Sequence, residues 1–153
     1  MAAYFLDTSG LVKRYVAEIG TAWVTGIMAP AGGNLLHVAR LTGVEVVSAL
    51  ARRARAGSLS AAHAAAAKAR FQADFATRFQ IVGITVAIVK QGMALAEAHA
   101  LRGYDAVQLA AALQAHRRCR AVGQSITLVS ADAELNAAAA AEGLRVEDPN
   151  MHP

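Results

Sequence analysis

The feature that most constrains the fold is an alternation of short apolar segments with longer, alanine-rich segments. β-type runs occur in AAYFL, at 35–38, at 81–84, in SITLV and in LRVE. The segments between them carry apolar residues at the spacing of a helix. Alternating strands and helices are typical of a mostly parallel sheet with helices on both faces. The sequence therefore predicts an α/β protein with a three-layer α/β/α fold.

The intervening segments predict seven helices in a single domain spanning residues 1–153. Of these residues 56% are hydrophobic, and many are alanine, a strong helix former. Glycines or capping residues bound most of these segments, with Ser60 expected to cap the fourth helix and Gly103 to end the fifth. The expected helices cover 10–20, a short stretch near Trp23, 41–56, 61–79, 87–103, 104–121 and 133–142.

Composition points to a reducing compartment. Cys119 is the only cysteine and has no internal disulfide partner. The chain does not open with a secretory signal pattern, and no run reaches the roughly 18 apolar residues of a membrane span. We therefore expect a cytoplasmic protein without a membrane partner.

The charge distribution suits a polyanionic partner such as a nucleic acid. The formal net charge is +4 and the sequence pI is about 9.7. Between Arg52 and Arg120 there are eleven basic residues and only three acids. Such an excess is a footprint of nucleic-acid binding. Solvated helix faces explain the same charge equally well, so charge alone leaves both interpretations open.

Four of the chain's acids fall at places that a parallel sheet brings together. Asp7 follows the first strand and Asp132 follows the strand in ITLVS. Ligands of open parallel sheets bind outside the carboxyl ends of strands. Asp105 is expected in the first turn of a helix that points at the same edge, and Glu45 lies near the start of another, between Val44 and Val46. The sequence thus predicts a cluster of carboxylates at one edge.

Taken singly, each acid also has a structural explanation. An Asp after a strand is often a turn former or a helix cap, and an acid in a first turn complements the helix dipole. Four converging carboxylates, however, repel one another unless a cation lies among them. Mg²⁺ and Mn²⁺ prefer such oxygen ligands. The five histidines show no zinc spacing, so no competing ligand set is evident.

Four motif blocks, in order along nearly the whole chain, resemble those of a PIN domain, and the likeness is greatest to VapC-type toxins of toxin–antitoxin pairs. The blocks are YFLDTSGLVKRY, the Glu of LTGVEVVSAL, GYDAVQLAAAL and LVSADAELNAAAAAEGL. The resemblance implies a PIN-like fold and a metal-dependent ribonuclease using Mg²⁺ or Mn²⁺. It implies a catalytic quartet of Asp7, Glu45, Asp105 and Asp132. Asp7 and Asp105 would be direct metal ligands, and Asp132 and Glu45 would act directly or through water. Supporting hydroxyls would come from Thr8, Ser9 and Ser130.

The site then suggests a reaction and partners. A bound Mg²⁺ would activate water for hydrolysis of an RNA phosphodiester. Lys13 and Arg14 are candidate phosphate contacts, as are Arg52, Arg53 and Arg55. The resemblance further implies a small antitoxin that covers the acidic pocket, often with a basic side chain, and a homodimer. The candidate contact residues for these partners are Trp23, Ile27, Met28, Phe71, Phe75 and Phe79, although core packing is the alternative for each.

Two other functions fit the same residues. A PIN fold without turnover would act with its antitoxin as a co-repressor of their operon. A phosphoacceptor or phosphatase domain would use Asp7 as its acid, but it would need a second acid beside Asp7, where this chain has Thr8 and Ser9.

Overall fold

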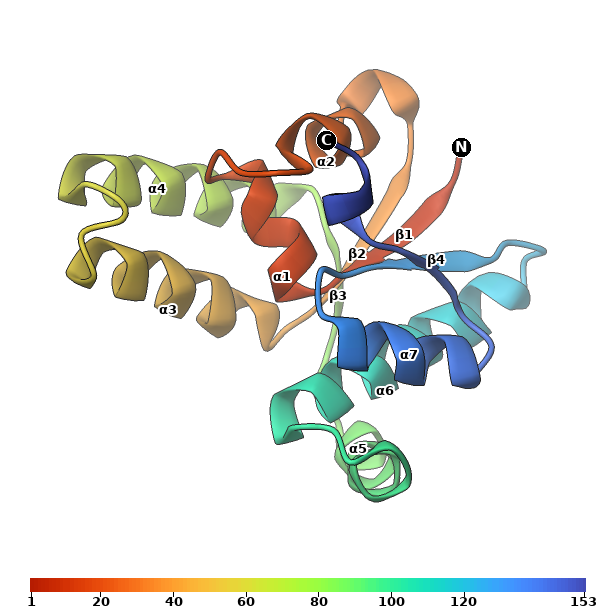
Figure 1. The fold of residues 1–153 in the computed structure, drawn as a ribbon. Coiled ribbons are helices and arrows are strands. Elements are labelled where there is room, and N and C mark those ends of the chain that lie inside the picture. Colours follow the sequence, from red (N-terminus) through yellow and green to blue (C-terminus); the bar gives the residue numbers. More distant parts are fainter.

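A computed structural model describes residues 1–153 and contains a five-stranded, fully parallel sheet (Figure 1). The strand order is β3-β2-β1-β4-β5, so the first strand of the chain lies in the middle. Ala3 of β1 pairs with Leu35 of β2 on one side and with Ile126 of β4 on the other. The strands are β1 (Ala3–Leu6), β2 (Leu35–Ala39), β3 (Gln80–Val82), β4 (Ile126–Val129) and β5 (Arg145–Glu147).

Helices cover both faces of this sheet, which confirms the predicted three-layer α/β/α architecture. The ribbon shows α5, α6 and α7 on one side of the strands and α1, α2 and α4 on the other (Figure 1). The helices are α1 (Thr8–Leu11), α2 (Thr21–Ile27), α3 (Thr42–Arg55), α4 (Ala61–Thr77), α5 (Val86–His99), α6 (Gly103–Arg120) and α7 (Ala133–Ala141). Short 3₁₀ turns occupy Val12–Arg14, Pro30–Gly32 and Pro149–Met151.

Two apolar cores form, one on each face of the sheet, because successive strand residues point to opposite faces. Phe5 of β1 and Leu128 of β4 pack with the cluster that includes α5, α6 and α7. Their chain neighbours Leu6 and Val129 pack with the cluster that includes α1 to α4. Both faces of the central strands are therefore buried, as expected for a parallel sheet.

The sheet has one topological switch point, between β1 and β4. From β1 the chain moves outward to β2 and β3, then returns across the sheet to β4 and β5. Leu6, the last residue of β1, pairs with Val129, the last residue of β4. In open α/β sheets, ligands bind outside the carboxyl ends of the strands at such a point. The topology thus predicts that the functional site lies just after Leu6 and Val129.

Two helix predictions were wrong at their ends. The helix predicted over 10–20 is a single turn of α1 followed by a 3₁₀ turn that ends at Arg14. The buried Lys13 ammonium donates to the Ile19 carbonyl oxygen at 2.9 Å, and this bond holds the following residues in a turn. The fifth helix ends at His99, before Ala100 with its φ of 52°, and Gly103 begins α6.

The aromatic and apolar residues suggested as partner contacts mostly pack inside the protein. Met28, Phe71 and Phe79 are buried in the core that includes α1 to α4. Trp23 stacks on the His152 ring, with centroids 4.3 Å apart. Their packing explains these side chains without a partner. None of the helices is long and apolar enough to span a membrane.

Candidate active site

Two of the predicted acids lie at the switch point because they begin the helices that follow β1 and β4. Asp7 is the N-cap of α1, and its Oδ2 accepts from the backbone N–H of Ser9 at 3.1 Å. The backbone N–H of Asp7 donates to the Val129 carbonyl at 3.0 Å, which joins the two strand ends. Asp132 is the N-cap of α7, and its Oδ1 accepts from the Leu135 N–H at 2.8 Å. The ends of the two strands and the capping hydrogen bonds together fix the positions of both carboxylates.

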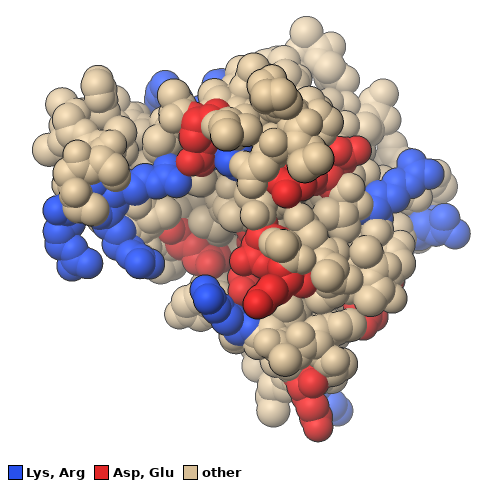
Figure 2. All heavy atoms as spheres, viewed as in Figure 1, with Lys and Arg blue, Asp and Glu red and all other residues tan.

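The other two acids belong to helices on opposite faces of the sheet. Glu45 is in the first turn of α3, and Asp105 is in the first turn of α6. A pocket of about 510 Å³ lies between them, and Figure 2 shows acidic side chains gathered in a hollow of this face. Its lining consists of Glu45, Arg52, Arg102, Gly103, Tyr104, Asp105 and Asp132. Asp7 is buried, only 4% exposed, and is not among the lining residues, although its charge acts on Asp105.

Burial and mutual repulsion raise the pKa of two of these carboxyls. Burial is the main cause for Asp7; the hydrogen bonds from Ser9 oppose the rise, and the charge of Glu45 adds to it. The pKa of Asp105 is raised to about 6, first by burial and then by the charges of Asp7 and Asp132. Sequence-distant acids therefore lie close enough to interact electrostatically.

Three hydroxyls connect the acids, at the positions predicted to support the site. Ser9 Oγ donates to Asp7 Oδ2 at 2.6 Å and lies 3.3 Å from Ser130 Oγ. The Asp132 N–H donates to Ser130 Oγ at 3.1 Å. Thr8 Oγ1 donates to Glu45 Oε1 at 3.1 Å. These bonds tie the turns after β1 and β4 to each other and to α3.

Gln108, which the sequence did not lead us to expect at the site, donates a hydrogen bond to the Glu45 carboxylate. Its side chain is fully buried on α6. Nε2 donates to Glu45 Oε1 at 2.5 Å and to Thr42 Oγ1 at 3.0 Å, with Thr8 Oγ1 at 3.5 Å. A signal for it was present: Gln108 lies three residues after Asp105, on the same face of a helix, within an otherwise apolar run.

Of the two basic residues next to the Asp7 turn, Lys13 lies differently from the expectation. Lys13 is 5% exposed, and its ammonium donates to Asn150 Oδ1 at 2.8 Å as well as to Ile19. Its charge is thus used inside the protein and is not presented to a substrate. Arg14 is half-buried, and its backbone carbonyl accepts from Arg70 at 3.1 Å. A phosphate contact by Arg14 stays a prediction.

The donor set fits a hard divalent cation, although the carboxylates do not form a closed cage. No three His, Cys, Asp or Glu side chains lie close enough together to constitute a ready-made metal site. Asp7, Glu45 and Asp132 instead accept hydrogen bonds from neighbouring groups, and the side chains at the site that could act as metal ligands supply oxygen atoms. Mg²⁺ commonly takes one or two carboxylates and completes its shell with waters and substrate phosphates. An open acidic pocket with raised pKa values suits that kind of binding.

These features define a class: an α/β protein with an acidic pocket at the switch point of a parallel sheet. The sequence matches the PIN domain family over residues 4–141, so the chain belongs to the PIN domain family. It is similar to Ribonuclease VapC45 and Ribonuclease VapC49 of two Mycobacterium tuberculosis strains, CDC 1551 / Oshkosh and ATCC 25618 / H37Rv. Each is 33% identical over 154 residues, with both chains covered completely.

Solved structures share the fold at low sequence identity. PAE2754 from Pyrobaculum aerophilum is 20% identical with a TM-score of 0.65, over 98% of this chain and 85% of that one. A toxin–antitoxin complex from Klebsiella pneumoniae is 20% identical with a TM-score of 0.62, over 95% and 97%. VapBC2 from Rickettsia felis, bound to a promoter DNA fragment, is 14% identical with a TM-score of 0.60, over 95% and 98%. These likenesses support the fold.

Proposed function

We propose that this protein is a divalent-metal-dependent ribonuclease and the toxin of a VapBC-like toxin–antitoxin pair. The observation that carries the proposal is the meeting of Asp7, Glu45, Asp105 and Asp132 around the switch point. Relatives named ribonucleases that align with the whole chain give the reaction class.

In this proposal the acids hold the cation and the surrounding groups hold the acids. A bound Mg²⁺ or Mn²⁺ supplies an activated water and stabilises charge on a phosphoryl oxygen. Asp7, Asp105 and Asp132 are the ligands, and Glu45 acts beside them directly or through water. Thr8 and Ser9 orient the carboxylates of Glu45 and Asp7 through their hydrogen bonds, and Ser130 accepts from the backbone N–H of Asp132. Gln108 is a positioning residue for Glu45.

The decisive experiment removes one carboxylate charge at a time. Purified Asp7→Asn and Asp105→Asn variants should lose RNA cleavage by at least about a hundred-fold while keeping the circular dichroism of the folded protein. EDTA should stop the wild-type reaction, and Mg²⁺ or Mn²⁺ should restore it. Wild-type rates in either variant, or full activity in EDTA, would contradict the proposal, provided that contaminating nuclease is excluded.

A small antitoxin and a homodimer complete the proposed assembly, which we place in the cytoplasm. An antitoxin partner is supported by the fold shared with a chain of the Klebsiella pneumoniae toxin–antitoxin complex. The acidic pocket offers a complementary surface to a basic side chain of such a partner. Light scattering on the purified protein, alone and with the product of an adjacent small gene, tests both assemblies.

A second candidate function is that of a catalytically silent co-repressor. It is favoured by the shared fold with Rickettsia felis VapBC2, whose structure contains promoter DNA. Under this alternative the wild-type protein cleaves no RNA in Mg²⁺, and the complex with its antitoxin retards the operon promoter in a gel-shift assay equally well with Asp7→Asn.

A further inference from the structure

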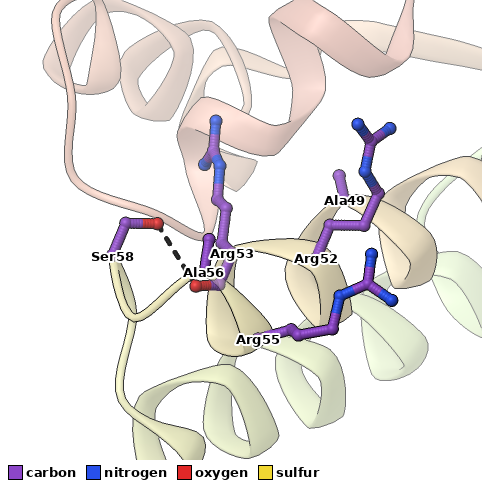
Figure 3. Close-up of a pocket in the computed structure, with 6 residues that line it drawn as sticks. All are labelled: Ala49, Arg52, Arg53, Arg55, Ala56 and Ser58. Atoms are coloured by element: carbon purple, nitrogen blue, oxygen red, sulfur yellow. Dashed lines mark hydrogen bonds between the residues drawn. The ribbon is translucent and has the colours of Figure 1, made fainter.

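A second pocket of about 520 Å³ opens at the end of α3, next to the acidic one. Three arginines, together with Ala49, Ala56 and Ser58, line it (Figure 3). The arginines are Arg52, Arg53 and Arg55, and all belong to the last turn of the helix. Arg52 also lines the acidic pocket, so the two pockets border the same side chain.

The three arginines are not equivalent. Arg53 is partly buried, and its Nη2 lies 3.3 Å from Glu18 Oε2 in an ion pair. Arg52 and Arg55 are exposed and make no ion pair or side-chain hydrogen bond. In Figure 3 the guanidinium groups of Arg52 and Arg55 both lie to the right of that of Arg53. Two positive charges without an ion-pair partner therefore face the solvent, and that of Arg52 borders the acidic pocket.

Figure 2 shows the same arrangement at the level of the surface: basic side chains over α3 flank the hollow in which the acidic side chains gather. A polyanion whose one phosphate lies at the acidic pocket would pass a neighbouring part of its backbone over this helix end. Guanidinium groups are suited to phosphate because they present several donors in a planar fork.

We propose that Arg52 and Arg55 form a binding site for the RNA backbone, holding a phosphate adjacent to the one at the acidic pocket. This inference rests on the proposed function, because it takes RNA as the substrate of the neighbouring site. Arg53 is a structural member of the pocket, held by Glu18. The shared position of Arg52 sets the direction in which the bound strand leaves the acids, along the C-terminal end of α3.

Binding can be separated from cleavage by working in EDTA. The measurement is fluorescence anisotropy of a short, labelled single-stranded RNA over a series of salt concentrations. Arg52→Ala/Arg55→Ala should bind about ten-fold more weakly than wild type, and its log–log salt slope should be shallower by about 1.4, since each single-strand phosphate contact contributes about 0.7. Arg52→Lys/Arg55→Lys keeps the charges and should retain most of the slope.

The chain offers a matched control in the last turn of α6. Arg117 and Arg120 have the same spacing as Arg52 and Arg55, and replacing both by Ala removes the same charge. They lie about 20 Å along the helix from Asp105, at 1.5 Å per residue. Arg117→Ala/Arg120→Ala should bind RNA as wild type does. Circular dichroism melting establishes that all variants are folded.

Three results would overturn the inference. Wild-type affinity and slope in Arg52→Ala/Arg55→Ala would do so, as would an equal loss in the control, which would indicate a non-specific charge effect. The third result is that Arg52→Ala/Arg55→Ala binds RNA normally but no longer binds a poly-glutamate peptide that the wild type binds. The pocket would then be a protein-docking site. In all three cases, Mg²⁺-dependent cleavage by the wild-type protein would leave the proposed function standing, so the two failures are distinguishable.

Discussion

The ionised carboxylate of Asp105 lowers the stability of the folded protein. Its pKa is raised from 3.8 to about 6, so between these pH values the folded chain binds more protons at this residue than the unfolded chain. Stability from this group is therefore greatest below pH 3.8 and falls as pH rises through about 6. The unfavourable contribution persists at neutral pH, unless a cation compensates it.

Replacing Asp105 by Asn should consequently stabilise the metal-free protein. Solvent screens the partly buried group, so we expect about 1 kcal/mol at neutral pH, or about 2–4 °C in Tm, and no gain well below pH 4. Mg²⁺ should raise the Tm of the wild type more than that of the variant, because ligands stabilise the state that binds them. Thermal melts in EDTA and in Mg²⁺ provide the measurement.

Glu97→Gln, which removes an exposed carboxylate on α5, is the control for that experiment. It should change neither the Tm in EDTA nor the response to Mg²⁺. A Tm of Asp105→Asn below that of the wild type at neutral pH in EDTA would show that the Asp105 charge is not repelled.

Gln108 provides a second prediction at the scale of one side chain. Gln108→Met keeps the volume but removes the donor to Glu45. Groups that hydrogen-bond to the residues of a metal site typically contribute 10–100-fold to activity or metal affinity. We expect a loss of about that size in kcat and a higher Mg²⁺ requirement. Gln114→Met, on the same helix without a hydrogen bond to Glu45, should behave as wild type. Unchanged Mg²⁺ dependence in Gln108→Met would leave Gln108 a purely structural residue.

At the scale of elements, the approach of α1 to the end of β4 sets the geometry of the switch point. A Cβ on Gly10 would lie 2.6 Å from the Val129 carbonyl oxygen, which is backbone and cannot move aside cheaply. Gly10→Ala should therefore destabilise the protein by about 1–3 kcal/mol, measured as a lower urea midpoint with an unchanged m-value.

Gly26 in α2 is the matched control, because a Cβ there would meet nothing within 4 Å. Gly26→Ala should stabilise the protein by about 0.5–1 kcal/mol through helix propensity. Equal effects of the two substitutions would mean that α1 can move away from β4 without penalty.

Elements with strong local signals could be predicted from the sequence, and those set by distant contacts could not. Ser60 caps α4 as expected, since the Ser side chain is itself the signal. Asp7 and Asp132 were placed correctly at one edge because strand ends and caps are local features. The turn after Arg14 depends on Asn150 and Ile19 binding Lys13, and no periodicity reveals that. The link from Gln108 to Glu45 likewise depends on how α6 meets α3.

At the scale of the whole molecule, side chains of the C-terminal segment contact and stabilise the region that follows the Asp7 turn. Lys13 donates to Asn150 across the chain, and Trp23 stacks on His152. Asn150→Ala would leave a buried ammonium without one of its acceptors, which should cost about 1–3 kcal/mol. Asn150→Asp supplies an acceptor again and should recover most of the loss. Thermal melts compare the two, and equal stability of Asn150→Ala and wild type would contradict this role.

The central position of β1 also governs when the acidic pocket exists during synthesis. Asp7 directly follows β1, which is synthesised before its neighbouring strand β4 and before Asp132 just beyond β4. Until then the nascent chain lacks one wall of the pocket and the bond from Asp7 to Val129. A chain built in this order cannot assemble the acidic pocket while it is growing until β4 and Asp132 have been synthesised.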